Sequence, residues 1–228
     1  MTSISTTFAK SSVRPLLLVL VLLSGATYSR NLLWTDDLTL MEDIVVKSPD
    51  KARGYIGLGK AYAMKGRLDK ALDALMMGVS LDPKDYSSYN DLGNVYSLMS
   101  NNVKAVDNYS KAIELNPQSD KAYYNRGDSY YDDGQFDKAI ADCTMAVTLN
   151  PNYARAFARL GSAYGKQGNY RQAIEQYTNA LSLEPEQAAV YYERGLANEL
   201  MGYRGKAMAD LRKACELGVK TACGLLNE

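Results

Sequence analysis

The sequence contains no histidine, and its charged residues show no excess of either sign. Histidine is the commonest general base and the commonest metal ligand, so its absence removes many catalytic and metal sites. The 26 lysines and arginines are balanced by 26 aspartates and glutamates. Proteins that bind nucleic acid normally carry a basic excess or a basic stripe, and we therefore expect no nucleic-acid partner.

Cysteine is scarce as well. The three cysteines, Cys143, Cys215 and Cys223, cannot form a four-cysteine zinc site, and no histidine is present to complete one. The sequence also shows no nucleophile–base pair and no phosphate-binding loop. We therefore expect no catalytic residue, no metal site and no cofactor, and we do not expect the chain to be an enzyme.

What the sequence does contain is a period of 34 residues. Prolines, glycines and alanines each recur at this interval, at Pro49, Pro83, Pro117, Pro151 and Pro185, at Gly59, Gly93, Gly127, Gly161 and Gly195, and at Ala71, Ala105, Ala139, Ala173 and Ala207. Proline ends a helix and restricts the residue before it. Glycine inside a helix costs about 1 kcal/mol relative to alanine, so its recurrence indicates that two helices approach closely there.

A second column of glycines marks the turn inside each repeat, because glycine readily adopts a positive φ. Ser100 stands in that column in the second repeat, and the glycines are Gly66, Gly134, Gly168 and Gly202. Between these marks the apolar residues recur at helical spacing. In the third and fifth repeats Arg126 and Arg194 replace a leucine. We expect their alkyl stems to cover the core while the guanidinium groups reach water.

A helix–turn–helix unit of 34 residues with these columns resembles the tetratricopeptide-repeat (TPR) family. Five units make up residues 52–221, at 52–85, 86–119, 120–153, 154–187 and 188–221. The resemblance implies an all-α fold, a right-handed TPR superhelix of antiparallel helix pairs. It also implies a protein-interaction scaffold that holds a peptide or a partner helix in a concave groove.

Shorter helices are expected at both ends of the repeats. Residues 34–47 read as a single helix that ends before Pro49, and we interpret residues 31–51 as an N-terminal cap. Val219 stands where the column of prolines would continue. A short helix to Leu226 should cover the last apolar face, so residues 219–228 form the C-terminal cap.

The N-terminus contains an uncharged apolar segment at residues 15–29. A helix that spans a membrane needs about 20 residues, so this segment fits the core of a signal peptide better. Small residues at 24–26 suit cleavage. An uncleaved membrane anchor and a buried helix of the solenoid are the alternatives. We interpret residues 1–30 as a signal peptide or membrane anchor, which places the repeats on the extracytoplasmic side.

The segment after this apolar stretch, with Arg30, Asn31, Trp34 and Asp37, resembles a junction in membrane proteins that join a glycosyltransferase-like domain to TPRs. This resemblance implies an alternative function for the chain. It would be an accessory or detached C-terminal TPR part of such a membrane protein.

The first helices of stacked TPRs line the concave groove. We expect the peptide-binding residues to be Asn90, Asn94, Tyr124, Asn125, Asp128, Tyr131, Arg155, Arg159, Ser162, Lys166 and Tyr192. Four of them, Asn94, Asn125, Arg155 and Arg159, resemble the clamp with which one TPR subclass grips the terminal carboxylates of chaperones. Asn90 departs from that pattern, which has a lysine there. The alternative is that asparagine is simply common at these positions.

Cys215 and Cys223 have seven residues between them. This spacing is similar to that of secreted, cysteine-rich relatives of TPRs, in which it bridges two helices, and it implies a disulfide in an oxidising compartment. The alternative is two buried, reduced side chains. Cys143 stands at a core position of its repeat and is interpreted as part of the core.

Overall fold

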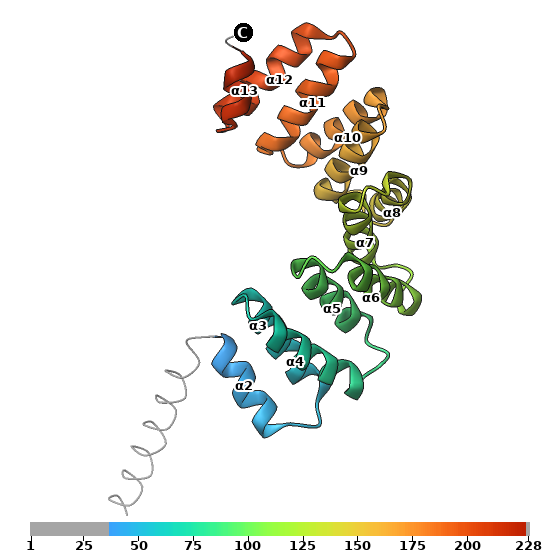
Figure 1. Cartoon of the computed structure of the whole chain (residues 1–228), viewed down its shortest axis with the longest axis vertical. Coiled ribbons are helices and arrows are strands. Elements are labelled where there is room, and N and C mark those ends of the chain that lie inside the picture. Colours follow the sequence, from blue (N-terminus) through green and yellow to red (C-terminus); the bar gives the residue numbers. More distant parts are fainter. Residues whose placement is uncertain (1–36, 227–228) are drawn as a thin grey trace, which may run out of the picture.

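The computed structural model describes residues 37–226, and every regular element in that range is an α-helix. The helices follow one another along an arch (Figure 1). Their bounds are α2 Asp37–Lys47, α3 Ala52–Met64, α4 Leu68–Leu81, α5 Tyr86–Leu98, α6 Asn102–Leu115, α7 Asp120–Asp132, α8 Phe136–Leu149, α9 Ala154–Lys166, α10 Tyr170–Leu183, α11 Ala188–Leu200, α12 Arg204–Glu216 and α13 Lys220–Leu225. The predicted all-α class is confirmed.

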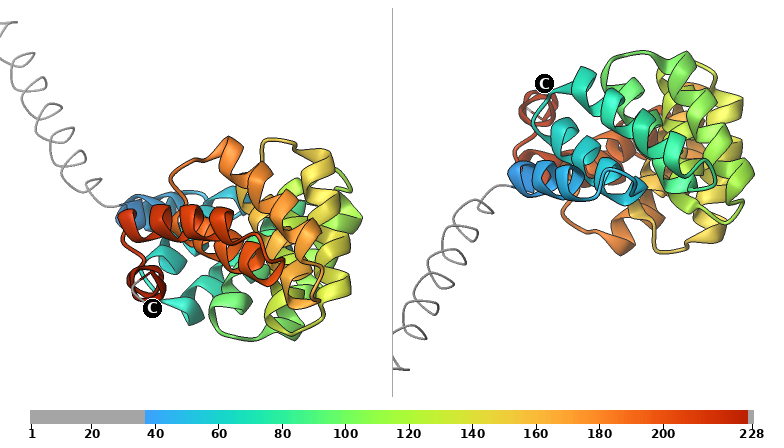
Figure 2. Two further views of the ribbon diagram at one scale, coloured as in Figure 1. Left: turned by 90° about the horizontal axis from the view of Figure 1, so that it is seen from above. Right: turned by 90° about the horizontal axis from the view of Figure 1, so that it is seen from below.

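The helices from α3 to α12 form five pairs, and each pair packs against the next. The first helices of the pairs begin 34 residues apart, at Ala52, Tyr86, Asp120, Ala154 and Ala188. Seen along its length, the array winds about a common axis (Figure 2). The tandem helix pairs predicted from the period are therefore present, and the first helices make the inner face of the arch.

The glycine in each first helix allows the two helices of a pair to approach closely. A Cβ atom on Gly93 would lie 2.5 Å from the ring of Tyr109, and one on Gly161 would lie 2.7 Å from the ring of Tyr177. Both rings are almost fully buried. Because the rings have no room to move away, these positions admit only glycine, and the close contact offsets the low helix propensity of that residue.

The turn inside each pair requires a residue with positive φ. Four of the five turns use glycine, with φ between 71° at Gly66 and 78° at Gly168. The turn between α5 and α6 uses Ser100 instead, with a φ of 58°. A residue with a Cβ atom is disfavoured in this conformation by about 1–2 kcal/mol, so Ser100 is a strained position of the fold.

We predict that Ser100→Gly stabilises the protein by about 1 kcal/mol, because it relieves this backbone strain. The matched control is Gly134→Ser, at the same place in the next pair, where a Cβ atom would meet nothing within 4 Å. It should lower stability by a similar amount through conformation alone. Urea unfolding followed by circular dichroism measures both changes, and a destabilised Ser100→Gly variant would contradict the prediction.

The expectation that the guanidinium groups of Arg126 and Arg194 reach water is wrong. Arg126 donates from Nε and Nη2 to the two carboxylate oxygens of Asp142, at 2.7 and 2.8 Å. The Arg126 side chain is 20% exposed and that of Asp142 9%. A third bond runs from Nη1 to Ser110 Oγ of the preceding pair, at 3.0 Å. The guanidinium therefore joins three helices, because its fork matches a carboxylate.

Arg194 repeats this arrangement in the fifth pair. It donates to Asp210 at 2.9 and 2.7 Å and to Thr178 Oγ1 at 3.1 Å. Only the two pairs with an arginine carry an aspartate at the facing position of the second helix. In the first pair the same two places hold Leu58 and Ala74. The chain thus uses an ion pair in two repeats at places where the first repeat has two apolar side chains.

We predict that Arg126→Leu alone lowers the free energy of unfolding by about 3 kcal/mol, because it leaves the Asp142 carboxylate buried without its partner. Combining Arg126→Leu with Asp142→Ala reproduces the composition of the first pair and should restore most of the loss. A double-mutant cycle in urea measures this coupling. If the double variant is as unstable as the single one, the ion pair is not the reason for the loss.

Each end of the array carries a single additional helix. Leu38 of α2 is buried against Leu58 and Ala61 of α3. At the other end, Ala222 of α13 is buried against Leu211 and Ala214 of α12. Both helices cover apolar surface that would otherwise face water, as expected for terminal caps.

The N-terminal interpretation falls outside the part of the chain that the structure describes. The expected signal peptide or anchor at 1–30 lies there, as do residues 34–36 of the expected first helix. Within residues 37–226, none of the helices combines the length and the apolar character needed to cross a bilayer.

The structure joins Cys215 and Cys223 by a disulfide, with an S–S distance of 2.01 Å and a Cα–Cα distance of 4.9 Å. The bond ties α13 to the end of α12. Cys143 is a free thiol and is fully buried. Burial raises the pKa of this thiol to about 12, so it stays protonated and unreactive at neutral pH.

We predict one reactive thiol in the denatured, unreduced protein from an oxidising compartment, and three after reduction. The native protein should react slowly or not at all, because Cys143 is covered and neutral. Titration with a thiol reagent gives the three numbers. Three reactive thiols before reduction would show that the Cys215–Cys223 bond does not form there.

Candidate functional site

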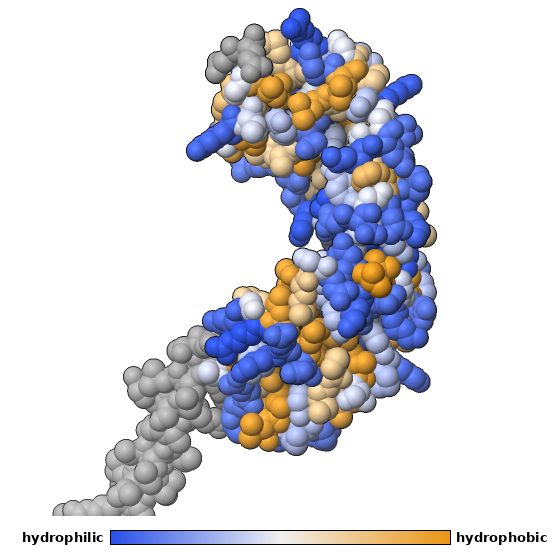
Figure 3. Space-filling model, viewed as in Figure 1, coloured by the Kyte–Doolittle hydropathy of each residue, from blue (hydrophilic) through white to orange (hydrophobic). Residues whose placement is uncertain are grey.

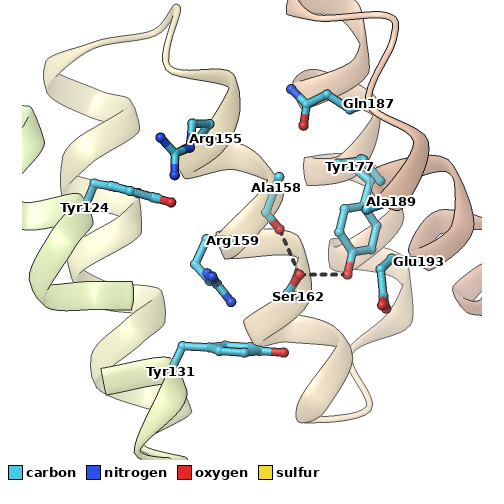
Figure 4. Close-up of a pocket in the computed structure, with 11 residues that line it drawn as sticks. Tyr124, Tyr131, Arg155, Ala158, Arg159, Ser162, Tyr177, Gln187, Ala189 and Glu193 are labelled. Carbon is cyan, nitrogen blue, oxygen red and sulfur yellow. Dashed lines mark hydrogen bonds between the residues drawn. The ribbon is translucent and has the colours of Figure 1, made fainter. Parts of the chain in front are cut away.

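The inner face of the arch contains a cavity of about 370 Å³ between the third, fourth and fifth helix pairs. The space-filling view shows that the arch is deeply concave on one side (Figure 3). Tyr124 and Tyr131 reach into it from α7, and Arg155 and Arg159 from α9 (Figure 4). The other lining residues are Ala158, Ser162, Tyr177, Gln187, Ala189, Val190 and Glu193.

Arg159 is held in place on the cavity wall. It forms an ion pair with Asp128 of α7, and its guanidinium carbon lies 4.6 Å from the centre of the Tyr131 ring. Burial raises the pKa of the Asp128 carboxyl, while the charge of Arg159 opposes that rise. Most of the charge of Arg159 is therefore used within the protein, and the pair ties α7 to α9.

Arg155 is in a different situation from Arg159. Its side chain is exposed, and its guanidinium carbon lies 5.6 Å from the centre of the Tyr124 ring. Tyr124 is itself fixed by the ring of Tyr153, at a centroid distance of 4.9 Å. No carboxylate of residues 37–226 forms an ion pair with Arg155, so its charge is available to a ligand.

The floor of the cavity is polar, but its groups are already hydrogen-bonded. Tyr177 OH donates to Ser162 Oγ at 3.3 Å, and Ser162 Oγ donates to the carbonyl of Ala158 at 3.1 Å (Figure 4). Burial raises the pKa of the Tyr177 phenol, so the hydroxyl remains neutral at ordinary pH. The floor therefore has a fixed shape and no charge.

The three predicted asparagines form a network of their own rather than lining this cavity. Asn125 Nδ2 donates to Asn90 Oδ1 and to Asn94 Oδ1, both at 3.0 Å. Tyr109 OH donates to Asn94 Oδ1 at 2.9 Å. These bonds join α5 to α7 and to α6. The clamp-like set is thus divided, with its amides bonded to one another and its arginines in the cavity.

Two further predicted groove residues lie elsewhere. Lys166 lines an adjoining cavity of about 170 Å³, which shares Tyr131, Ser162, Tyr177 and Glu193 with the first. Tyr192 packs against the apolar cluster at the C-terminal cap. The structure thus brings five of the predicted residues to the main cavity, namely Tyr124, Tyr131, Arg155, Arg159 and Ser162.

The residues of α11 that line the cavity were not predicted, although Tyr192 of the same helix was. Glu193 and Val190 line the cavity from α11, and Tyr177 reaches it from α10. The 34-residue period could have identified Glu193, because this residue stands 34 residues after Arg159 and 68 after Asn125, which were both predicted to line the groove. The ring of Tyr177 is buried, but its hydroxyl reaches the cavity floor.

The chain belongs to the tetratricopeptide-repeat family. Models of the TPR repeat match residues 52–85, 101–134, 120–153, 154–187 and 188–217. A crystal structure of a MamA protein is 30% identical and superposes with a TM-score of 0.66, covering 75% of this chain and 93% of that one. No protein with a curated description matches the chain.

Two further solved structures show the same fold. YrrB, described as a TPR protein with an unusual peptide-binding site, is 22% identical, with a TM-score of 0.68 over 82% of this chain and 98% of its own. MamA from Desulfovibrio magneticus RS-1, from residue 41 to its end, is 24% identical, with a TM-score of 0.68 over 74% of this chain and 95% of its own.

Proposed function

We propose that this protein is an interaction scaffold that binds an extended segment of another protein in the groove between α7, α9 and α11. The observation that carries the proposal is the unpaired guanidinium of Arg155 beside the tyrosines of a preformed cavity. Tyrosine side chains offer both apolar surface and hydrogen-bonding hydroxyl groups, which suits the recognition of a peptide. The scaffold needs no chemical step to act.

Several side chains of the groove are already held by contacts within the protein. Arg159 is fixed by Asp128 and Tyr131, and Ser162 by its two hydrogen bonds. A partner therefore gives up its own freedom on binding, while the groove loses little. Arg155 would then form a charge-assisted hydrogen bond with an acidic side chain or a terminal carboxylate.

We also infer that the repeats act outside the cytoplasm. The disulfide at the C-terminal cap supports this, because such bonds persist in oxidising compartments and are rare in the cytosol. Fractionation of cells that produce the full chain, with protease added to intact cells or spheroplasts, tests the location.

We predict that Arg155→Ala weakens binding of a fluorescein-labelled peptide that ends in two glutamates and a free carboxylate. The expected loss is about fivefold, because an exposed ion pair contributes roughly 1 kcal/mol. The measurement is fluorescence anisotropy on the full chain. The affinity of the unchanged protein should fall as salt is raised, because salt screens the ion pair. Arg171→Ala is the control, since Arg171 lies on α10, is exposed and lines neither cavity. Equal effects of the two substitutions would overturn the proposal.

A further inference from the structure

The cavity contains two charged side chains that the protein leaves unpaired. Arg155 comes from α9, and Glu193 comes from α11 on the opposite side of the cavity (Figure 4). Both side chains are exposed. Within residues 37–226, neither forms a hydrogen bond or an ion pair. Arg159 is the other charged residue of the lining, and its charge is taken up by Asp128.

The other polar side chains of the lining are uncharged apart from Arg159, which is paired with Asp128. Between them lie the bonded hydroxyls of Tyr177 and Ser162 and the small side chains of Ala158 and Ala189. The floor therefore carries no charge. Arg155 and Glu193 are the charged groups that can each pair with a charged side chain of the ligand. Glu193 also lines the adjoining cavity, so its carboxylate stands where the two cavities meet.

Lys166 is the cation that shares this second cavity with Glu193. The structure shows no ion pair between them within residues 37–226, although both side chains are exposed. Arg155 near the start of α9 lines the first cavity, Lys166 at the end of α9 lines the second, and Glu193 lines both, so the free charges alternate along the groove.

We propose that Glu193 is a specificity residue and that the groove selects segments carrying both an acidic and a basic side chain. The acidic side chain pairs with Arg155, and the basic side chain, a lysine or an arginine, pairs with Glu193. This inference rests on the proposed function, since it names the chemistry of the segment that the groove binds.

The reason is electrostatic complementarity. A purely acidic segment gains from Arg155 but brings its charge close to Glu193, so it binds more weakly than a segment that also carries a basic side chain. A purely basic segment gains from Glu193 but brings its charge close to Arg155. Only a segment with both charges neutralises both walls, and like-charge contacts of this kind are how interfaces reject wrong partners.

The position of Glu193 in the repeat supports a role in choice of ligand rather than in folding. The same place in the two preceding repeats holds Arg159 and Asn125, and both of those side chains bond to neighbouring repeats. Glu193 makes no such bond in the described residues. Its charge is not needed to hold α11 in the array.

The test is selection of a phage-displayed library of random octapeptides on the full-length protein. Peptides enriched on the unchanged protein should contain acidic and basic residues together. On Glu193→Gln the enrichment of basic residues should disappear while that of acidic residues remains, and on Arg155→Gln the reverse is expected. Arg171→Gln, on α10 and outside both cavities, serves as a control and should leave both enrichments in place.

The binding affinity of one enriched peptide then measures the size of the effect. Replacing its basic residue by glutamine should weaken binding to the unchanged protein by about threefold to tenfold, but should leave binding to Glu193→Gln nearly unchanged. If Glu193→Gln still enriches basic residues, while Arg155→Gln abolishes acidic ones, the inference fails and the proposed function stands. If neither substitution alters the selected peptides, both are overturned. Because both side chains are exposed, the variants should fold, which circular dichroism checks.

Discussion

The close contact between the glycine of each first helix and one side chain of the second helix sets the geometry of the whole array. At the five glycines a Cβ atom would lie between 2.5 and 3.1 Å from that side chain. In the second and fourth pairs the contact is made by a tyrosine, Tyr109 or Tyr177. The ring fills the space between the helices, and its hydroxyl emerges on the inner face. There it bonds to Asn94 in one pair and to Ser162 in the other. The packing rule of the fold therefore also positions polar groups along the groove.

The inner face changes in character along the arch. Toward its N-terminal part, between α5 and α7, the amides bond to one another and hold neighbouring pairs together. Toward its C-terminal part, between α9 and α11, charged groups face an open cavity without partners in the described residues. The same positions of the repeat thus bond to neighbouring repeats in one place and face an open cavity in another. The residues whose pattern resembles a clamp are therefore divided into two groups with different contacts.

The period of the sequence was sufficient to predict the helices, the pairing and the turn at Ser100, because proline, glycine and alanine have strong local effects. It was not sufficient for Arg126, whose partner Asp142 lies on another helix and becomes visible only when the facing positions are compared. The groove was predicted in part for the same reason. Tyr131 and Arg159 follow from helical spacing within one repeat, whereas Glu193 belongs to the site only because α11 packs beside α9. Local patterns say which way a side chain points, and the stacking of repeats decides what it meets.

The disulfide at the C-terminal cap has a consequence for how the array comes apart. In a stack with contacts only between neighbours, unfolding spreads inward from the ends. Helix α13 has six residues, fewer than the roughly 12–15 that an isolated helix needs to persist in water. Its attachment to α12 through Cys215 and Cys223 keeps this boundary from fraying. Reduction would make hydrogen exchange in α12 and α13 faster while leaving the groove on α7 and α9 protected. The redox state of one bond would thus decide the lifetime of this end of the solenoid, independently of what the groove binds.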